Sequence, residues 1–176
     1  MKKLNLGCGK DIKEGYVNVD FVKQKGINVV CDLEKFPWPF KDNEFDEVFA
    51  SHFLEHVKDF ERTLLEIKRI TKRGAIIRIR VPHFSCGVTY RDPTHKTFFS
   101  YFTFNYYEKI NKNYEKPEAL RFIKIKKKKL NFTRLAFTSL NYIFNPIINL
   151  NPSIYERFLC WVLPCSEVLF ILKNIK

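Results

Sequence analysis

Short apolar runs that end in a small or acidic residue recur through the first part of the chain. Runs of this kind are typical of strands in an α/β sheet, where ligand-binding groups follow the strand ends. They predict strands over residues 3–6, 16–20, 27–32 and 44–50. The beginning of the chain is therefore expected to build the ligand-binding part of a sheet.

The spacing of apolar residues changes after the fourth of these strands. Apolar residues at helical intervals predict a helix over residues 60–72, with Asp59 as its N-cap and Gly74 after its end. The next apolar run predicts a strand over residues 75–81, which Pro82 ends because proline donates no backbone hydrogen bond. Strands that alternate with a helix in this order indicate an α/β sheet.

The second half of the chain begins with an irregular, aromatic stretch over residues 83–116. Irregular stretches of this length are usually functional lids, although an apolar plug packed on the sheet is an alternative. Beyond it, the pattern predicts a strand over residues 120–132, helices over 133–144 and 153–163, and a final strand over 167–172. The lysines at 126–129 suit a protected edge strand.

No internal repeat or flexible linker divides the 176 residues, a length that suits one domain. Within this single domain we expect a cofactor-binding half at residues 1–82 and a lid or acceptor region at 83–116. A C-terminal unit of strand, helices and strand is expected at 117–176.

The chain carries 31 basic and 19 acidic residues, a net charge of +12. This balance favours acidic partners such as nucleic acid, anionic lipid or phosphorylated small molecules, unless the lysines only solvate the surface. Five cysteines without a C-x-x-C pair predict reduced thiols and a cytoplasmic protein rather than a disulfide framework or zinc site. No run approaches the ~18 apolar residues of a spanning helix.

The residues at the first strand ends carry the most specific chemistry. Gly7 and Gly9 follow the first strand, where the lack of a Cβ lets a ligand approach the backbone. Asp20 ends the second strand and can accept two hydrogen bonds from a ribose diol. Asp32 ends the third strand and can accept from an adenine amino group while Leu33 packs on the ring.

The order of these pieces resembles the class I S-adenosylmethionine-dependent methyltransferases, especially the small type-11-like group. A nicotinamide dinucleotide site fits less well, because the third glycine of its fingerprint is missing and Asp20 comes too early. The pieces that carry the resemblance are Leu6-Gly7-Cys8-Gly9, Asn18-Val19-Asp20, Cys31-Asp32-Leu33, residues 45–57, and residues 66–82.

The resemblance implies a Rossmann-like sheet of about seven strands with the last one antiparallel, and S-adenosyl-L-methionine as the cofactor. It places the glycine loop at the amino-acid end of the cofactor, Asp20 on the ribose and Asp32 near the adenine. Ser51 and His52 would lie close to the sulfonium. The implied cofactor-binding residues are Gly7, Cys8, Gly9, Asp20, Asp32, Leu33, Ser51 and His52.

Two features depart from the family pattern. Only residues 10–15 separate the first two strands, whereas a parallel crossover normally takes about a dozen residues or more, so the first crossover helix must be shortened or lost. Arg78 and Arg80 alternate along a strand that should be apolar on both faces. That face is expected to be thinly covered or covered by a second subunit, which would make the protein an oligomer.

His83, Asp92 and His95 follow the fifth strand, where the acceptor would sit, and are the candidate catalytic residues. A histidine there can take a proton from a hydroxyl or amine near neutral pH, but an Asp-Pro turn with a hydrogen-bonded histidine is an equal alternative. His52 and His56 lie four residues apart, yet the H-E-x-x-H order is absent and no metal site is predicted.

The sequence therefore predicts methyl transfer to an oxygen or nitrogen of a small-molecule or glycan acceptor, and an anionic acceptor would suit the basic surface. The alternative is a degenerate methyltransferase-fold module that binds RNA or an anionic membrane surface through its basic C-terminal half, around residues 124–129. Nucleic acid is a less favoured partner than a small molecule. A further hypothesis is peripheral membrane contact through the apolar segment 142–163.

Overall fold

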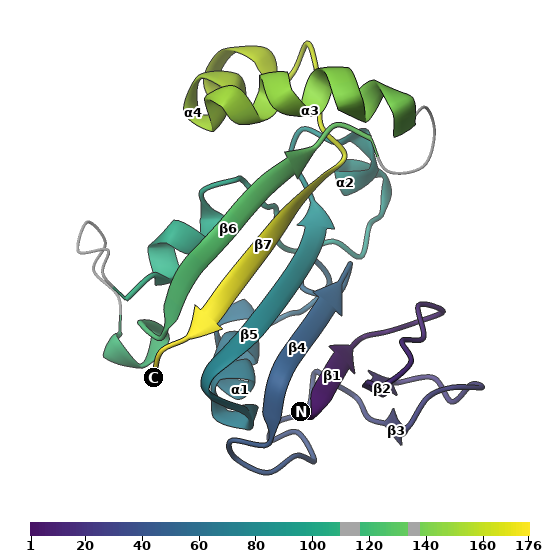
Figure 1. Ribbon diagram of the computed structural model, residues 1–176. Coiled ribbons are helices and arrows are strands. Elements are labelled where there is room, and N and C mark those ends of the chain that lie inside the picture. The colour runs from purple at the N-terminus through teal and green to yellow at the C-terminus, as the bar shows by residue number, and fades with distance from the viewer. Residues whose placement is uncertain (110–116, 134–137) are drawn as a thin grey trace.

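A computed structural model describes residues 1–109, 117–133 and 138–176, which form one seven-stranded sheet of order β3-β2-β1-β4-β5-β7-β6 (Figure 1). Strands β1 to β5 pair in parallel, and β7 runs antiparallel to both β5 and β6. The predicted Rossmann-like methyltransferase sheet with an antiparallel last strand is confirmed. Its strands are β1 (Lys3–Leu6), β2 (Val17–Asp20), β3 (Val29–Val30), β4 (Phe45–Ser51), β5 (Thr71–Pro82), β6 (Ile123–Asn131) and β7 (Glu167–Asn174).

The helices are few and mostly short. None of those described is long and apolar enough to cross a membrane. The α-helices are α1 (Phe60–Ile70), α2 (Gly87–Arg91), α3 (Asn141–Leu150) and α4 (Pro152–Ile154). Single turns are η1 (Thr103–Tyr107), η2 (Glu118–Leu120), η3 (Thr138–Leu140) and the π-turn η4 (Tyr155–Leu159).

Three predicted helices differ from the structure in their bounds. The one predicted over 153–163 is the short α4 continued by the π-turn η4, which ends at Leu159. Helix α1 ends at Ile70 rather than residue 72, because the Thr71 hydroxyl donates to the carbonyl of Ile67 (2.6 Å) and Thr71 already begins β5. The helix predicted over 133–144 is wrong in its bounds: α3 runs from 141 to 150 and contains Pro146. Residues 134–137 lie outside the described residues.

One face of the sheet is covered by α1 and by the aromatic segment that was predicted as a lid or plug. Phe99, Phe104 and Tyr107 of this segment are buried, and the Phe104 ring meets Phe170 of β7 edge-on at 4.6 Å between centroids. These rings form the plug. Phe98 is exposed, and residues 110–116 of the predicted lid lie outside the described residues.

The opposite face of β4 and β5 is crossed by no helix of the described residues, and Figure 1 looks onto it. Arg78 pairs there with Glu47 (2.7 Å), and Arg80 pairs with Glu167 of β7 (2.9 Å). The alternating arginines of β5 therefore point to the thinly covered side of the sheet, one of the two expected outcomes.

The first crossover has lost its helix, as predicted, and asparagine side chains hold the short loop in its place. Asn5 Nδ2 donates to Asn18 Oδ1 (2.9 Å) and to the carbonyl of Asp11 (2.7 Å). Asn18 accepts from the backbone amide of Lys13 and donates to the Lys13 carbonyl, both at 3.0 Å. The β2 strand is fixed to the next loop where Asn18 N donates to Asn28 Oδ1 (2.7 Å). These bonds satisfy backbone groups that a helix would otherwise satisfy.

Replacing Asn18 by alanine removes a buried side chain that serves Asn5 and both backbone groups of Lys13. We expect Asn18→Ala to lower the free energy of unfolding by about 2–3 kcal/mol, because buried partners are left without hydrogen bonds. Asn28→Ala, at an exposed position of the same network, should cost about 1 kcal/mol. Urea unfolding measures both, and equal losses for the two variants would contradict this account.

Glu167 makes the sheet sensitive to acid. Burial alone would raise the pKa of its carboxyl, but hydrogen bonds from His52, Asn131 and Arg80 outweigh burial and lower the pKa to about 2 from an ordinary 4.5. Because the pKa is depressed in the folded state, the stabilisation is complete above pH 4.5 and is lost as the pH falls from 4.5 towards 2.

We therefore expect Glu167→Gln to lower the free energy of unfolding at pH 7 by about 3 kcal/mol, and to flatten its decline between pH 4.5 and 2. Urea unfolding at several pH values measures both effects. The matched control is Glu14→Gln at an exposed position. An unchanged acid dependence in Glu167→Gln would show that another group controls it.

Candidate functional site

A cavity of about 400 Å³ opens at the carboxyl ends of β1, β2 and β3. Four of the residues assigned to the cofactor line it: Gly7, Asp20, Asp32 and Leu33. The carboxyl ends of parallel strands are where α/β sheets bind ligands, so this cavity lies where the resemblance places the cofactor. We call it the strand-end cavity.

The glycine loop lies beside this cavity, but its three residues play different parts. Gly7 has a φ of +56°, and a Cβ there would lie 2.5 Å from the Phe53 ring, so the bare backbone makes room for that ring. Gly9, with a φ of +49°, donates its backbone N–H to Asp20 Oδ2 (2.8 Å). Cys8 is buried, and burial raises the pKa of its thiol to about 11. Cys8 and Gly9 do not line the cavity.

The two strand-end acids keep capacity to bind a ligand. Asp20 accepts backbone hydrogen bonds from Gly9 and Val22, one on each carboxylate oxygen, so two of its four lone-pair sites remain. Asp32 is exposed and accepts from the amide of Glu34 (3.1 Å). Both carboxylates face the strand-end cavity, as a ribose diol and an adenine amino group would require.

A second cavity, of about 450 Å³, adjoins the first at the ends of β4, β5 and β7. We call it the histidine cavity. Its polar lining includes His52, Glu55, His56, Asp92, His95 and Glu167. His56 lines both cavities. His52 was assigned to the cofactor but belongs to this second cavity, and Ser51 at the end of β4 lines neither.

Hydrogen bonds fix which nitrogen of each cavity histidine carries the proton. The Thr94 hydroxyl donates to Asp92 Oδ1 (2.6 Å), so it must accept from His56 Nδ1 (2.8 Å). His95 Nδ1 donates to the carbonyl of Thr89 (2.9 Å). In both neutral rings the lone pair is therefore on Nε2, the form needed to accept a proton. The Thr94 hydrogen bonds also lower the pKa of Asp92, which keeps it ionised.

His83 is placed differently from the other two catalytic candidates. It is fully buried, with Nδ1 at 2.8 Å from the Ser85 hydroxyl and Nε2 at 3.0 Å from Glu156. It lines neither cavity. Asp92 and His95 thus come together in the histidine cavity, whereas the geometry of His83 suits the anchoring of Glu156.

Sequence reasoning did not single out Glu167, Glu55 or Phe53. Glu167 is the first residue of β7, and because β7 is antiparallel, that residue lies opposite Pro82 at the carboxyl end of β5. A single acid at the head of an apolar final strand was the signal that could have identified it. Phe53 gave no signal, since its role depends on its contact with Gly7.

One group of described side chains could hold a metal ion, although none was predicted. Ligand atoms of Glu55, His56 and His95 all lie within 4.8 Å of one another. Glu55 Oε2 is buried without a hydrogen-bond partner, whereas Oε1 lies 3.2 Å from His52 Nδ1. Two imidazoles and a carboxylate suit a divalent transition metal better than magnesium. The same groups can transfer protons without a metal.

Comparison with known proteins agrees with this site. The profile of a family described as "Methyltransferase domain" matches residues 7–79, which contain the glycine loop and the strand-end acids. No curated protein matches the chain. The matched segment ends inside β5, so it contains every lining residue of the strand-end cavity except Thr94 and only part of the histidine cavity.

Solved structures extend the likeness to the whole fold. An S-adenosylmethionine-dependent methyltransferase from Archaeoglobus fulgidus is 23% identical, with a TM-score of 0.59 over 98% of this chain and 86% of that one. A second from Mesorhizobium loti is 13% identical, with a TM-score of 0.59 over 98% and 90%. The [4+2]-cyclase SpnF is 14% identical, with a TM-score of 0.60 over 98% and 74%.

At these identities the solved structures show the fold, and SpnF shows that the fold also serves other chemistry. The family profile adds a sequence match over residues 7–79. The chain thus has the fold of S-adenosylmethionine-dependent methyltransferases, and its residues 7–79 match the profile of a methyltransferase domain, which together support an enzyme whose cofactor is S-adenosyl-L-methionine.

Proposed function

We propose that the enzyme binds S-adenosyl-L-methionine in the strand-end cavity and methylates an oxygen or nitrogen of a small-molecule or glycan acceptor held in the histidine cavity. The observation that supports this division is the position of His56, which lines both cavities. Direct transfer requires two adjoining cavities, because the methyl group moves only between groups held in contact.

In this proposal Asp20 holds the ribose and Asp32 the adenine, with Leu33 against the ring and the glycine loop near the amino-acid end. The cofactor supplies an electrophilic methyl group when it is bound. Asp20 fits its role because it lines the strand-end cavity and its carboxylate is fixed by Gly9 and Val22, which leave two of its lone-pair sites unused.

The chain's own contribution to the reaction is to orient the acceptor and to take its proton. His56 and His95 each present an Nε2 lone pair, as their Nδ1 atoms are engaged by Thr94 and Thr89. General base catalysis by a histidine needs this tautomer within reach of the acceptor hydroxyl or amine. Of the two, we propose His95 as the base, because it lines only the histidine cavity, whereas His56 lines both cavities.

The charge of the histidine cavity refines the acceptor class. Its described lining contains the carboxylates Glu55, Asp92 and Glu167 and no lysine or arginine. A neutral acceptor rich in hydroxyl or amino groups fits these carboxylates better than the anionic acceptor that the net charge suggested. All five cysteines are free, and we infer the cytoplasm as the compartment.

Binding of S-adenosylhomocysteine, measured by calorimetry, tests the strand-end cavity. We expect micromolar affinity in the wild type and a loss of about 10- to 100-fold in Asp20→Asn, which keeps the shape but loses the charge-assisted hydrogen bonds. Asp11→Asn, at an exposed position, is the matched control. If the wild type gave no detectable heat, the enzyme proposal would be wrong, and the alternative of a degenerate methyltransferase-fold module that binds RNA or a membrane would be favoured.

Transfer of a tritiated methyl group into fractionated small-molecule and glycan extracts tests the histidine cavity. We expect His95→Gln to reduce transfer by about 10²-fold or more without weakening S-adenosylhomocysteine binding, because a positioned base contributes about that factor. The same assay after chelation separates proton transfer from a metal role of the Glu55–His56–His95 group. Full transfer by His95→Gln would exclude His95 as the base.

A further inference from the structure

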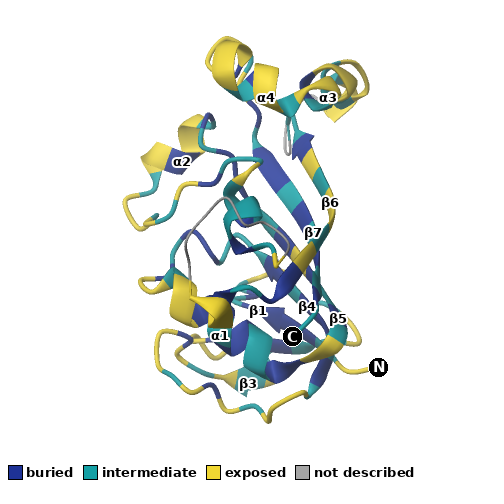
Figure 2. Ribbon diagram, turned by 90° about the vertical axis from the view of Figure 1, so that its left-hand side faces the viewer, coloured by how far each residue is buried: buried dark blue, intermediate teal, exposed yellow. Residues whose placement is uncertain are grey.

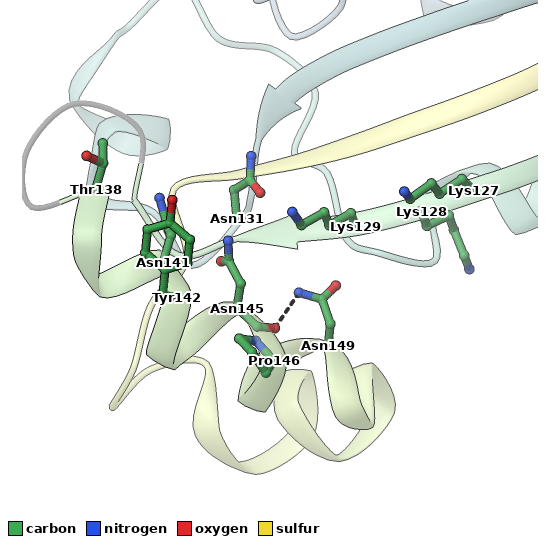
Figure 3. Close-up of a pocket in the computed structure, with 10 residues that line it drawn as sticks. All are labelled: Lys127, Lys128, Lys129, Asn131, Thr138, Asn141, Tyr142, Asn145, Pro146 and Asn149. Atoms are coloured by element: carbon green, nitrogen blue, oxygen red, sulfur yellow. Dashed lines mark hydrogen bonds between the residues drawn. The ribbon is translucent and has the colours of Figure 1, made fainter.

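The asparagine side of α3 faces the protein together with Ile148 and Phe144, and the remaining apolar residues of the helix face outward. Asn141, Asn145 and Asn149, spaced four residues apart, point from α3 towards β6 and the segment that follows it (Figure 3). Leu150 on the outer side and Tyr142 at the edge of the groove beside β6 are each 88% exposed.

The side chains of these asparagines form hydrogen bonds with the backbone that they face. Asn149 accepts from the amide of Leu130 and donates to its carbonyl, both at 2.8 Å. Asn145 accepts from the amide of Phe132 (2.8 Å), and Asn141 makes the same pair of bonds with Thr133 at 3.0 and 2.8 Å. The polar face of α3 is therefore fixed inward by five hydrogen bonds, and rotation of the helix to bury its apolar side would break them.

More exposed apolar side chains follow in the turns after α3. Figure 2 shows α3 and α4 at the same end of the molecule, both largely exposed. We call this the apolar surface and define it by its most exposed members: Tyr142, Ile143, Leu150, Phe158, Trp161 and Val162. A cluster of large apolar side chains within 21 residues marks a surface that is covered when the protein functions.

The charges around the apolar surface indicate what covers it. Between Glu118 and Glu167, Glu156 is the only acidic residue of the sequence. Its carboxylate is turned inward, where it accepts from the Ser100 hydroxyl (2.7 Å) and the amide of Tyr101 (2.6 Å). Residues 119–166 therefore contribute basic side chains, and no outward-facing carboxylate, to the side of the molecule that carries the apolar surface.

Cations lie directly beside the apolar side chains. Lys127 and Lys129 of β6 line a groove of about 770 Å³ together with Tyr142 (Figure 3). Arg157 lies over the Phe158 ring at 5.4 Å. A second copy of the chain on this surface would bring like charges together, and RNA would leave the apolar side chains without a partner.

We propose that the apolar surface and its flanking lysines dock the enzyme on an anionic phospholipid surface, with α3 lying in the interface plane. Short amphipathic helices with aromatic residues and neighbouring cations bind membranes in this way. Tyr142 and Trp161 have the apolar body and polar tip that suit the headgroup region. Trp161 also packs on Phe84 (5.7 Å), in the segment between β5 and α2 that leads into the histidine cavity.

The test is flotation of the full-length protein with vesicles of phosphatidylcholine alone and of phosphatidylcholine mixed with phosphatidylglycerol. We expect the wild type to float with the anionic vesicles. The Tyr142→Ser, Leu150→Ser, Val162→Ser variant should lose at least tenfold in partitioning, and its fold should survive because all three side chains are exposed. The Val22→Ser, Val30→Ser variant, at exposed positions of the β2–β3 end, is the matched control.

Tryptophan emission gives a second measurement on the same samples. The chain has two tryptophans, Trp38 at 2% and Trp161 at 66% exposure, so a vesicle-dependent blue shift reports on Trp161. We expect this shift with anionic vesicles and its loss in Trp161→Phe.

Four results would overturn the proposal. They are no flotation with anionic vesicles, equal flotation of the triple-serine variant, equal flotation of a Lys127→Gln, Lys129→Gln variant, and a dimer in light scattering that the triple-serine variant abolishes. The last result would assign the apolar surface to a second copy of the chain. None of them bears on binding of S-adenosylhomocysteine, so the proposed function is tested separately.

Discussion

A backbone amide or carbonyl that leaves water must find another partner, and this constraint governs a chain with so few helices. In a parallel sheet the crossover helices usually provide internal partners for the connecting backbone. Here the first crossover has no helix, and Asn5 and Asn18 supply the missing partners from within the strands themselves. The same solution appears at the other edge of the sheet, where three asparagines of α3 satisfy Leu130, Phe132 and Thr133.

These asparagine hydrogen bonds also position the residues of the site. Because Asn18 holds the loop after β1, the Gly9 amide reaches Asp20, and the acid is fixed at the end of β2. Further along the sheet, Glu167 begins β7 and is held by Arg80 and Asn131 beside His52. The strand-end and histidine cavities are thus bounded by side chains whose orientation the backbone network determines.

The strands were predictable from the sequence because each carries a local signal of apolar runs and end residues, whereas the sheet of about seven strands with an antiparallel last strand came from the family resemblance. The sequence also placed Asp20 at the end of β2, since a strand end is a local property, whereas Asp32 lies two residues beyond β3, which is shorter than the predicted strand. The pairing of Gly7 with Phe53 was not predictable, because the φ of +56° at Gly7 and the ring position both depend on contacts between separate segments. His83 and His95 look alike in sequence, and only their contacts distinguish them: both ring nitrogens of His83 are engaged, whereas His95 lines the histidine cavity.

The C-terminal helices show why helical periodicity alone was misleading. Apolar residues recur along α3 as they would on a core-facing helix, yet only Ile148 of that helix is buried. The three asparagines determine the orientation of α3, because their five hydrogen bonds to the backbone at the end of β6 hold the polar side of the helix inward. Apolar side chains left outside cost free energy in water, and that cost is removed only when a surface of matching chemistry covers them. The sheet edge therefore fixes the helix, and the fixed helix defines the environment in which the enzyme is expected to work.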